Sequence, residues 1–241
     1  MAAAWAGRPG SNTSRGPVLG SRPPKAPMTT SKQAPSKADT AHLEVFAGLS
    51  LAQIEVPATR AQFEAATAEI LAAGTVGFDT ESKPTFAPGE LSSGPHVVQF
   101  ALPERAFIFQ VHRNEGRELL IELLRSEALH KVGFGLGSDR SQVQAKLGVP
   151  LGALIDLGTL FRPLGYRNAV GVRAAVAIVF ERRFIKSKRV TTSNWALPQL
   201  NSSQLLYAAN DAWAALRVYQ ALQAGAGPSA MMAGPRSGDR A

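Results

Sequence analysis

The chain has 241 residues, 45% of them hydrophobic, so it is long enough to bury one substantial core. It contains no cysteine, which excludes disulfides, a thiolate nucleophile and a cysteine-ligated zinc site, and no stretch is apolar enough to predict a membrane span. The net charge of +8 is uneven, because residues 1–38 hold several Lys and Arg and no Asp or Glu. The basic balance is therefore weak evidence for a nucleic-acid partner.

The two ends of the chain differ in composition from the middle. Residues 1–38 are rich in Gly, Pro, Ser and Ala and are predicted to be a disordered basic tail, with Met1 and Met28 as alternative starts. An acid-free N-terminus also fits an organelle transit peptide, although its prolines argue against a continuous amphipathic helix. Residues 224–241 are predicted to be disordered too, which leaves 39–223 as the expected domain. The absence of cysteine fits a cytoplasmic location, which includes association with the nucleoid.

Between the tails, helical and strand patterns are mixed. The expected elements, in chain order, are a helix at 59–74, a strand at 75–81, two antiparallel strands at 96–102 and 105–111, a helix at 116–129, a strand at 130–134, a helix at 139–148, a strand at 153–158, and helices at 168–180 and 202–223. Strands come early and alternate with helices later. This order predicts an α/β fold, with one mixed sheet that contains an antiparallel meander and has helices on both faces.

The expected strand at 75–81 carries two acids in a run that is otherwise typical of a core. Side chains alternate along a strand, so Asp79 and Glu81 share one face while Phe78 and Thr80 point the other way. The Cα atoms of the two acids are expected ~6.5 Å apart, close enough to bind one ion together. An exposed edge strand with two solvated acids explains the same pattern equally well.

The last expected helix contains the run YAAND. Tyr207 and Asp211 are four residues apart, which places them about 40° apart around the helix and therefore on one face. They lie beside the apolar stripe of this helix, at a boundary that can face a cleft. Taken alone, a tyrosine at a core margin next to a solvated aspartate is the simpler explanation.

A third motif follows the strand at 130–134. The run KVGFGLGSDRSQV ends that strand in a Gly-rich turn and begins a helix near Ser138 and Asp139. Ordinary helix capping explains both residues, because Ser and Asp are favoured in the first turn. Capping is compatible with ligand binding and does not exclude it.

These three motifs, in this order, resemble the DEDD superfamily of 3′-5′ exonucleases. The D-x-E of residues 79–81 resembles the first motif, GLGSD the second, and Y-x-x-x-D the third motif of the tyrosine subtype. The likeness spans roughly residues 56–223 and is greater to the RNase D and Werner-type branches than to polymerase proofreading domains. It implies a ribonuclease H-like fold and an enzyme that hydrolyses phosphodiester bonds from the free 3′ end of nucleic acid, releasing nucleoside 5′-monophosphates by a two-metal mechanism.

The resemblance also implies roles for the acids. By similarity, Asp79, Glu81 and Asp211 hold one divalent cation, and Asp79 bridges to a second, which Asp139 supports through water. Tyr207 orients the attacking water. Four converging carboxylates raise one another's pKa unless cations lie between them, and ligands that are all oxygen select Mg²⁺ or Mn²⁺ over zinc.

A basic segment precedes the third motif. Residues 182–189, RRFIKSKR, are predicted to handle substrate, with Lys186, Lys188 and Arg189 holding phosphates. An isolated run of this kind is usually a solvated loop. Trp195 is a candidate for stacking on a base, and a core position is the commoner place for such a side chain.

Two alternatives come from other protein classes. GFGLGS suggests a dinucleotide-binding turn with Asp156 as its ribose acid, but Ser138 stands where the third glycine is required, and Asp156 is expected to form hydrogen bonds at a strand end. A catalytically inactive nucleic-acid-binding module with the same fold is disfavoured because all four acids and the tyrosine are present. His96 and Gln99, near the first motif, are assigned structural roles.

The kind of nucleic acid is less well determined by the sequence. RNase D-type chains carry helical domains after the nuclease domain, whereas a short tail follows residue 223 here. DNA is therefore favoured over RNA, as in a Werner-type exonuclease without its helicase. An RNase D-like exoribonuclease that acts in RNA processing is the alternative.

Overall fold

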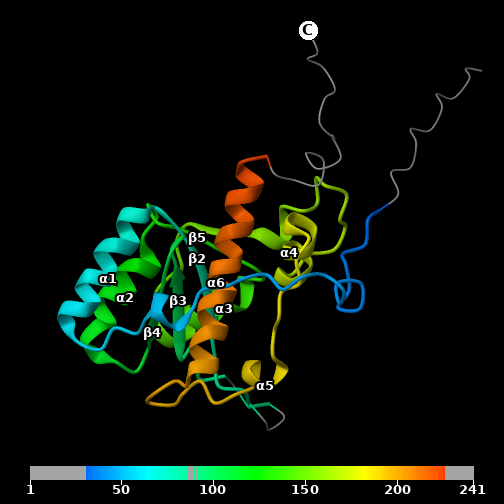
Figure 1. The fold of residues 1–241 in the computed structure, drawn as a ribbon. Coiled ribbons are helices and arrows are strands. Elements are labelled where there is room, and N and C mark those ends of the chain that lie inside the picture. Colours follow the sequence, from blue (N-terminus) through cyan, green and yellow to red (C-terminus); the bar gives the residue numbers. More distant parts are fainter. Residues whose placement is uncertain (1–30, 86–88, 91, 226–241) are drawn as a thin grey trace, which may run out of the picture. The chain divides into compact units, whose positions relative to one another are not determined.

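A computed structural model describes residues 31–85, 89–90 and 92–225, and this part of the chain contains a six-stranded sheet with helices around it (Figure 1). The strands are β1 (Ile54–Glu55), β2 (Thr75–Glu81), β3 (Val97–Ala101), β4 (Ala106–Gln110), β5 (His130–Gly133) and β6 (Leu154–Asp156). The helices are α1 (Arg60–Ala73), α2 (Arg117–Arg125), α3 (Gly137–Leu147), α4 (Val172–Phe180), α5 (Lys188–Thr191) and α6 (Ser202–Gln223). Three short 3₁₀ helices are η1 (Leu51–Gln53), η2 (Asn114–Gly116) and η3 (Leu157–Thr159).

The sheet is mixed and has the order β1-β4-β3-β2-β5-β6. β2, β3 and β4 pair antiparallel, while β2 with β5 and β5 with β6 pair parallel. Every residue of β3 and β4 is buried, as expected for strands covered on both faces. The predicted mixed sheet with an antiparallel meander is confirmed. Edge strand β1, which pairs parallel with β4, was not predicted, because two residues are too few to show a periodic pattern.

Local signals explain where α1 begins and ends. Thr59 forms a capping box with Gln62, and Gly74 ends the helix in the left-handed region at φ +65°. The helices predicted at 116–129 and 168–180 are shorter in the structure. α2 ends at Arg125, and α4 begins at Val172, after Gly171. The sequence pattern therefore located both helices and the C-terminal end of α4, but not the other ends.

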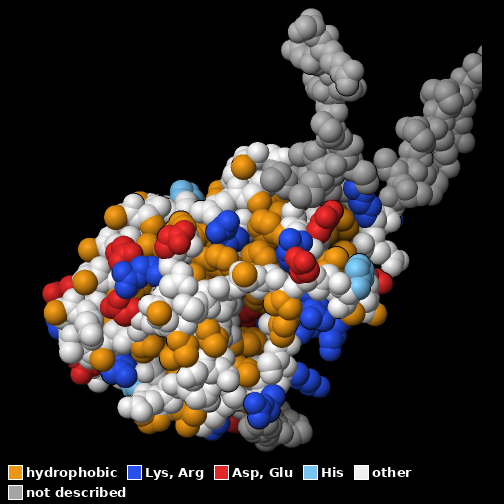
Figure 2. Space-filling model, in the orientation of Figure 1, with side chains coloured by type: hydrophobic (Ala, Val, Ile, Leu, Met, Phe, Trp, Pro, Cys, Tyr) orange, Lys and Arg blue, Asp and Glu red, His pale blue; other side chains and the backbone are white. Residues whose placement is uncertain are grey.

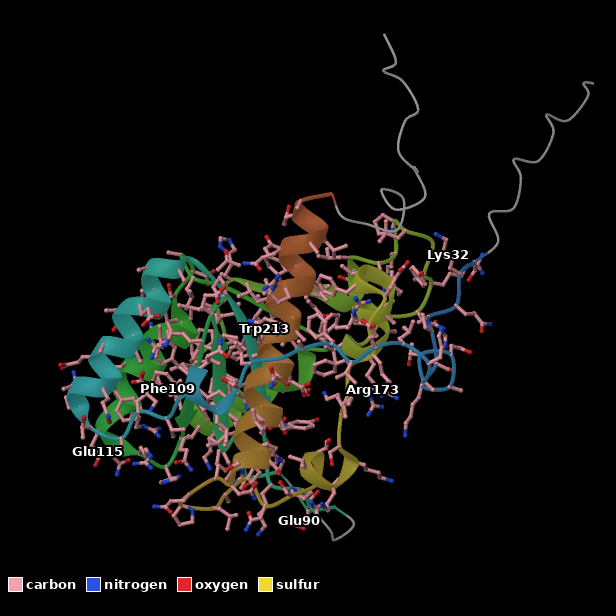
Figure 3. The ribbon with its side chains drawn as sticks, in the orientation of Figure 1. Lys32, Glu90, Phe109, Glu115, Arg173 and Trp213 are labelled. Atoms are coloured by element: carbon pink, nitrogen blue, oxygen red, sulfur yellow. The ribbon has the colours of Figure 1, made fainter. Side chains whose placement is uncertain are left out.

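The two faces of the sheet are covered by different helices. On one face, α1, α2 and α3 pack on Phe78, Phe100 and Phe109, and the rings of Phe63 and Phe109 are 5.3 Å apart (Figure 3). On the other face, α6 packs along the sheet beside α4, and its Trp213 ring lies 5.5 Å from that of Phe46. The predicted arrangement of helices on both faces is confirmed.

The close contact between α6 and β2 depends on Gly77. A Cβ atom at Gly77 would collide with the backbone carbonyl oxygen of Ala212, so only a glycine lets the helix backbone come this near to the strand. Because Asp79 follows Gly77 on the same face of β2 and Asp211 precedes Ala212 on α6, this contact brings the two acids together. The close approach of α6 to β2 is thus required to form the site.

The described residues include part of the predicted N-terminal tail. Lys32 donates its backbone N–H to the carbonyl oxygen of Gly165 at 3.0 Å, and its ammonium lies 5.8 Å from the ring centre of Tyr166. Residues 1–30, with both alternative starts, and residues 226–241 lie outside the described part. Within the described part, no helix has the length and apolar character that crossing a membrane requires.

Candidate active site

Three carboxylates from two elements meet over the middle of the sheet. Asp79 and Glu81 come from β2 and Asp211 from α6, and their ligand oxygens all lie within 4.8 Å of one another. Glu81 is 9% exposed and Asp211 5% exposed. The shared face of Asp79 and Glu81 is the one that α6 covers, as the alternation along β2 requires.

Burial and mutual repulsion disfavour the charged forms of these acids. Burial, followed by the charge of Asp79, raises the pKa of Glu81 to about 9. Burial also raises the pKa of Asp79 well above its ordinary value, and the charges of Asp211 and Asp139 add to this effect. A divalent cation among the oxygens would offset both causes, and an all-oxygen set of donors suits a hard cation. The three residues therefore fit such an ion.

Asp139 lies at the N-terminal end of α3 and is not part of this group of three. Its Oδ1 accepts a hydrogen bond of 2.6 Å from the Thr80 hydroxyl, and the Ser138 hydroxyl lies 3.3 Å from its Oδ2. Burial raises the pKa of Asp139, and the bond from Thr80 opposes this. Thr80, which points away from Asp79 along β2, was not among the predicted site residues. Its hydroxyl contacts Asp139, and no pattern in the sequence indicates that contact.

Tyr207 lies one turn before Asp211 on α6. Its phenol oxygen lies 2.8 Å from the Thr191 hydroxyl, which is also 3.0 Å from the carbonyl oxygen of Ser187. Burial, followed by the charge of Asp211, raises the pKa of Tyr207 to about 12. The phenol therefore keeps its proton at neutral pH, and this side chain can donate a hydrogen bond to a water or a phosphate oxygen.

Lys186 contacts the carboxylates directly. Its ammonium lies 2.6 Å from Oδ2 of Asp211 and 5.3 Å from the ring centre of Tyr207. Burial lowers the pKa of Lys186, but the charges of Asp211 and Asp79 outweigh it and hold the pKa above its ordinary value. The sequence predicted that Lys186 holds a phosphate, whereas in this structure it is paired with an acid of the site.

The Arg173 side chain holds the backbone of the basic segment, and the last two residues of the segment are exposed. Arg173 of α4 donates to the carbonyl oxygen of Lys186 at 2.6 Å (Figure 3). Lys188 and Arg189 are exposed in α5, which Ser187 caps at its N-terminus. Figure 2 shows Lys and Arg side chains gathered around α5 and the segment that leads to it. Of residues 182–189, only Lys188 and Arg189 thus belong to a helix.

Trp195 does not fit the predicted stacking role. It is 1% exposed, its indole N–H donates to the carbonyl oxygen of Thr191 at 3.2 Å, and it packs in the apolar cluster under α6. A ring buried in this way cannot stack on a base of the substrate. Trp195 therefore occupies a core position, which was the alternative that the sequence left open.

A cavity of about 370 Å³ borders Asp211 on the side of α6 that faces α5. Tyr207, Asp211 and Arg189 line it together with apolar side chains, among which Ile185 is 61% exposed. Phe46 also contributes to the wall, and it comes from a segment that precedes the first predicted element. The lining thus combines apolar side chains with one cation, Arg189, and one acid, Asp211.

The dinucleotide-binding alternative does not agree with the position of Asp156. Its Oδ1 accepts the N–H groups of Gly135 and Gly158 at 3.1 and 3.0 Å, and its Oδ2 accepts that of Leu136 at 3.1 Å. Both oxygens thus hold the turns that follow β5 and β6, as the sequence led us to expect for a residue that forms hydrogen bonds at a strand end.

Comparison with known proteins supports one family. The family profile described as 3′-5′ exonuclease matches residues 54–225. The bifunctional 3′-5′ exonuclease/ATP-dependent helicase WRN of Mus musculus is 29% identical over 153 residues, which cover 61% of this chain and 11% of that protein. A 3′-5′ exonuclease of Arabidopsis thaliana is 27% identical over 150 residues, covering 61% and 52%. The chain thus spans from about a tenth to about half of the length of these relatives.

Solved structures share the fold. The exonuclease domain of Nibbler from Aedes aegypti superimposes with a TM-score of 0.60 at 21% identity, covering 76% of this chain and 95% of that one. Escherichia coli RNase D gives 0.61 at 18% identity, covering 72% and 45%. These similarities confirm the predicted ribonuclease H-like architecture. The profile covers well over half of the length of this chain. The chain therefore belongs to the 3′-5′ exonuclease family, in agreement with its resemblance to the tyrosine subtype of the DEDD superfamily.

Proposed function

We propose that this chain is a 3′-5′ exonuclease that hydrolyses phosphodiester bonds from the 3′ end of nucleic acid and releases nucleoside 5′-monophosphates. The observation that carries the proposal is the convergence of Asp79, Glu81 and Asp211, with ligand oxygens within 4.8 Å of one another. Membership of the 3′-5′ exonuclease family supports the same reaction. Charges this close and this buried are difficult to explain as ordinary surface acids.

The cofactors of the proposed enzyme are two divalent cations, Mg²⁺ or Mn²⁺. Asp79, Glu81 and Asp211 would hold one ion. Asp79 would bridge to the second, and Asp139, which stands apart from the other three acids, would support that ion through water. When bound, such ions polarise the phosphoryl group and neutralise charge on the attacking and leaving oxygens.

The protein's own contribution to the reaction is orientation. With its proton retained, Tyr207 would donate a hydrogen bond that fixes the position of the attacking water, and the contact with the Thr191 hydroxyl would hold the phenol in place. A phenol with a pKa of about 12 is unsuited to act as a base at neutral pH. The cavity beside Tyr207 would receive the terminal nucleotide, with the exposed Ile185 against its base.

DNA is the favoured substrate, on the basis of the likeness to the Werner-type branch. An RNase D-like exoribonuclease is the second candidate, because RNase D of Trypanosoma brucei, solved in complex with RNA, has the same fold with a TM-score of 0.61. We would incubate the chain with 5′-labelled single-stranded DNA, recessed duplex DNA and RNA of one sequence, with Mg²⁺ and Mn²⁺ in parallel. A ladder of shortening labelled products on DNA is expected. Immediate release of the labelled end as a mononucleotide would contradict the polarity, and binding without cleavage would favour an inactive module.

Replacing Tyr207 by Phe is expected to lower the cleavage rate by roughly 10²-fold, because one oriented hydrogen-bond donor is lost at the reacting water. The ring, and with it the packing against Trp195 at 5.9 Å, is retained. Single-turnover kinetics would measure the rate, and calorimetric titration with Mn²⁺ would show unchanged metal affinity. Cleavage by Tyr207→Phe at the wild-type rate would exclude the water-positioning role.

Replacing Lys188 by Ala is expected to weaken binding of a single-stranded oligonucleotide and to reduce the slope of log affinity against log salt by about 0.7, as for one lost phosphate contact. Fluorescence anisotropy at several salt concentrations would measure both quantities. Arg125→Ala is the matched control, because it removes an equal charge from an exposed position in α2, on the other face of the sheet. An identical loss in the two variants would point to net charge alone and not to a contact at α5.

A further inference from the structure

Gln99, in the centre of β3, is a buried amide without a hydrogen-bond partner. Its side chain is 0% exposed, and neither its Oε1 nor its Nε2 has a partner among the described residues. A buried amide in this state destabilises a fold, because its lost contacts with water are not replaced. The structural role that the sequence suggested for Gln99 does not account for an amide group that bonds to nothing.

The pairing of the strands places Gln99 beside an acid of the candidate active site. Gln99 lies directly opposite Asp79 on β2 and opposite Ile108 on β4. Side chains of directly opposed residues on antiparallel strands share a face, with Cβ atoms about 4.5–5.5 Å apart. Of these two cross-strand neighbours, Asp79 alone offers a group that can accept a hydrogen bond.

The neighbours of Gln99 along its own strand are apolar, and the polar Glu81 and Gln110 on the same face of the sheet lie opposite Val97, one diagonal step away. Val97 and Ala101, which share its face of β3, belong to the cluster formed with Ala209 and Ala212 of α6 and with Trp195. Aliphatic side chains in these positions cannot satisfy an amide, and the N–H groups inside α6 are already used within the helix, so none of them can donate to the Gln99 oxygen. The directly opposed carboxylate of Asp79 is therefore the candidate hydrogen-bond acceptor for the Gln99 amide.

We infer that Gln99 is a positioning residue for Asp79: when a divalent cation is bound, the amide N–H of Gln99 donates to the Asp79 carboxylate and holds its orientation. The backbone N–H of Thr80 already donates to Oδ1 of Asp79 at 2.9 Å, so a second donor from β3 would fix the carboxylate from the opposite side. Donors to a ligating carboxylate hold its orientation and contribute to metal affinity. This inference rests on the cation site of the proposed function.

The inference predicts opposite effects on metal affinity and on stability. Gln99→Leu removes both polar atoms at similar volume, and Gln99→Met does so without branching. Both variants are expected to bind Mn²⁺ roughly 10-fold more weakly than the wild type, because the orienting donor is lost. In EDTA both are expected to unfold at or above the wild-type temperature, because an unpaired buried amide is removed. Titration calorimetry with Mn²⁺ and thermal unfolding of the full chain would measure the two quantities.

Thr67→Val provides a matched control. The Thr67 hydroxyl is also buried and without a partner, but it belongs to α1 on the other face of the sheet. This variant is expected to keep the wild-type affinity for Mn²⁺. Wild-type affinity in both Gln99 variants would overturn the inference, as would an equal loss in Thr67→Val or a failure of both Gln99 variants to fold. A wild-type chain that binds no Mn²⁺ would instead refute the cation site itself.

Discussion

Replacing Asp79 by Ala is expected to lower the rate of phosphodiester cleavage by at least ~10³-fold, equivalent to about 4 kcal/mol of transition-state stabilisation. Asp79 is proposed to contact both cations, so its loss removes a ligand from each of them at once. No neighbour can replace it, because Glu81 and Asp211 already face the same site. Single-turnover cleavage of a 5′-labelled oligonucleotide, with Mg²⁺ and with Mn²⁺, would measure the loss.

The same substitution is expected to stabilise the metal-free protein, since it removes one of three buried acids that repel one another. Thermal unfolding in EDTA would therefore show a higher midpoint for Asp79→Ala than for the wild type. Glu64→Ala is a suitable control, because Glu64 is an exposed acid paired with Arg60 on α1, which packs on the face of the sheet opposite to α6. Cleavage by Asp79→Ala at the wild-type rate with either metal would contradict the two-metal proposal.

The stability of the metal-free protein is expected to fall as the pH rises from about 4.5 to about 9. Glu81 has an ordinary pKa of 4.5, which burial and the charge of Asp79 raise to about 9 in the folded chain. Between these values the folded state holds a proton that the unfolded state has released. The free energy of unfolding therefore decreases with pH, by on the order of 1 kcal/mol per pH unit for one such group. Below pH 4.5 both states hold the proton and this loss is absent.

Denaturant unfolding in EDTA at pH values across this window would test the expectation. Glu81→Gln is expected to have a flatter pH profile than the wild type, because it removes the titrating group while retaining its shape. Glu64→Gln, at an exposed position, is expected to parallel the wild type. Saturating Mn²⁺ is expected to raise the wild-type stability most at the alkaline end, where the acids are charged. Equal slopes for the wild type and Glu81→Gln would show that Glu81 does not carry the effect.

Local patterns were enough to predict most of the fold. The alternation in residues 75–81 requires Asp79 and Glu81 to share a face, and the four-residue spacing in the last helix requires the same of Tyr207 and Asp211. Both rules depend on backbone geometry within a few residues, so they hold before any tertiary contact forms. The two-residue strand β1 and the four-residue helix α5 were missed, because neither is long enough to establish a period.

The sequence by itself thus determined the elements, their order and the acids that they carry. Only the tertiary structure decided which residues meet. The approach of α6 to β2 at Gly77 brings Asp211 to the acids of the strand, and the path of the segment before α5 pairs Lys186 with Asp211. Sheet register sets Gln99 opposite Asp79, and burial removes Trp195 from solvent. These contacts join segments that are far apart in the chain, so they follow from how whole elements pack, which no local period of the sequence encodes.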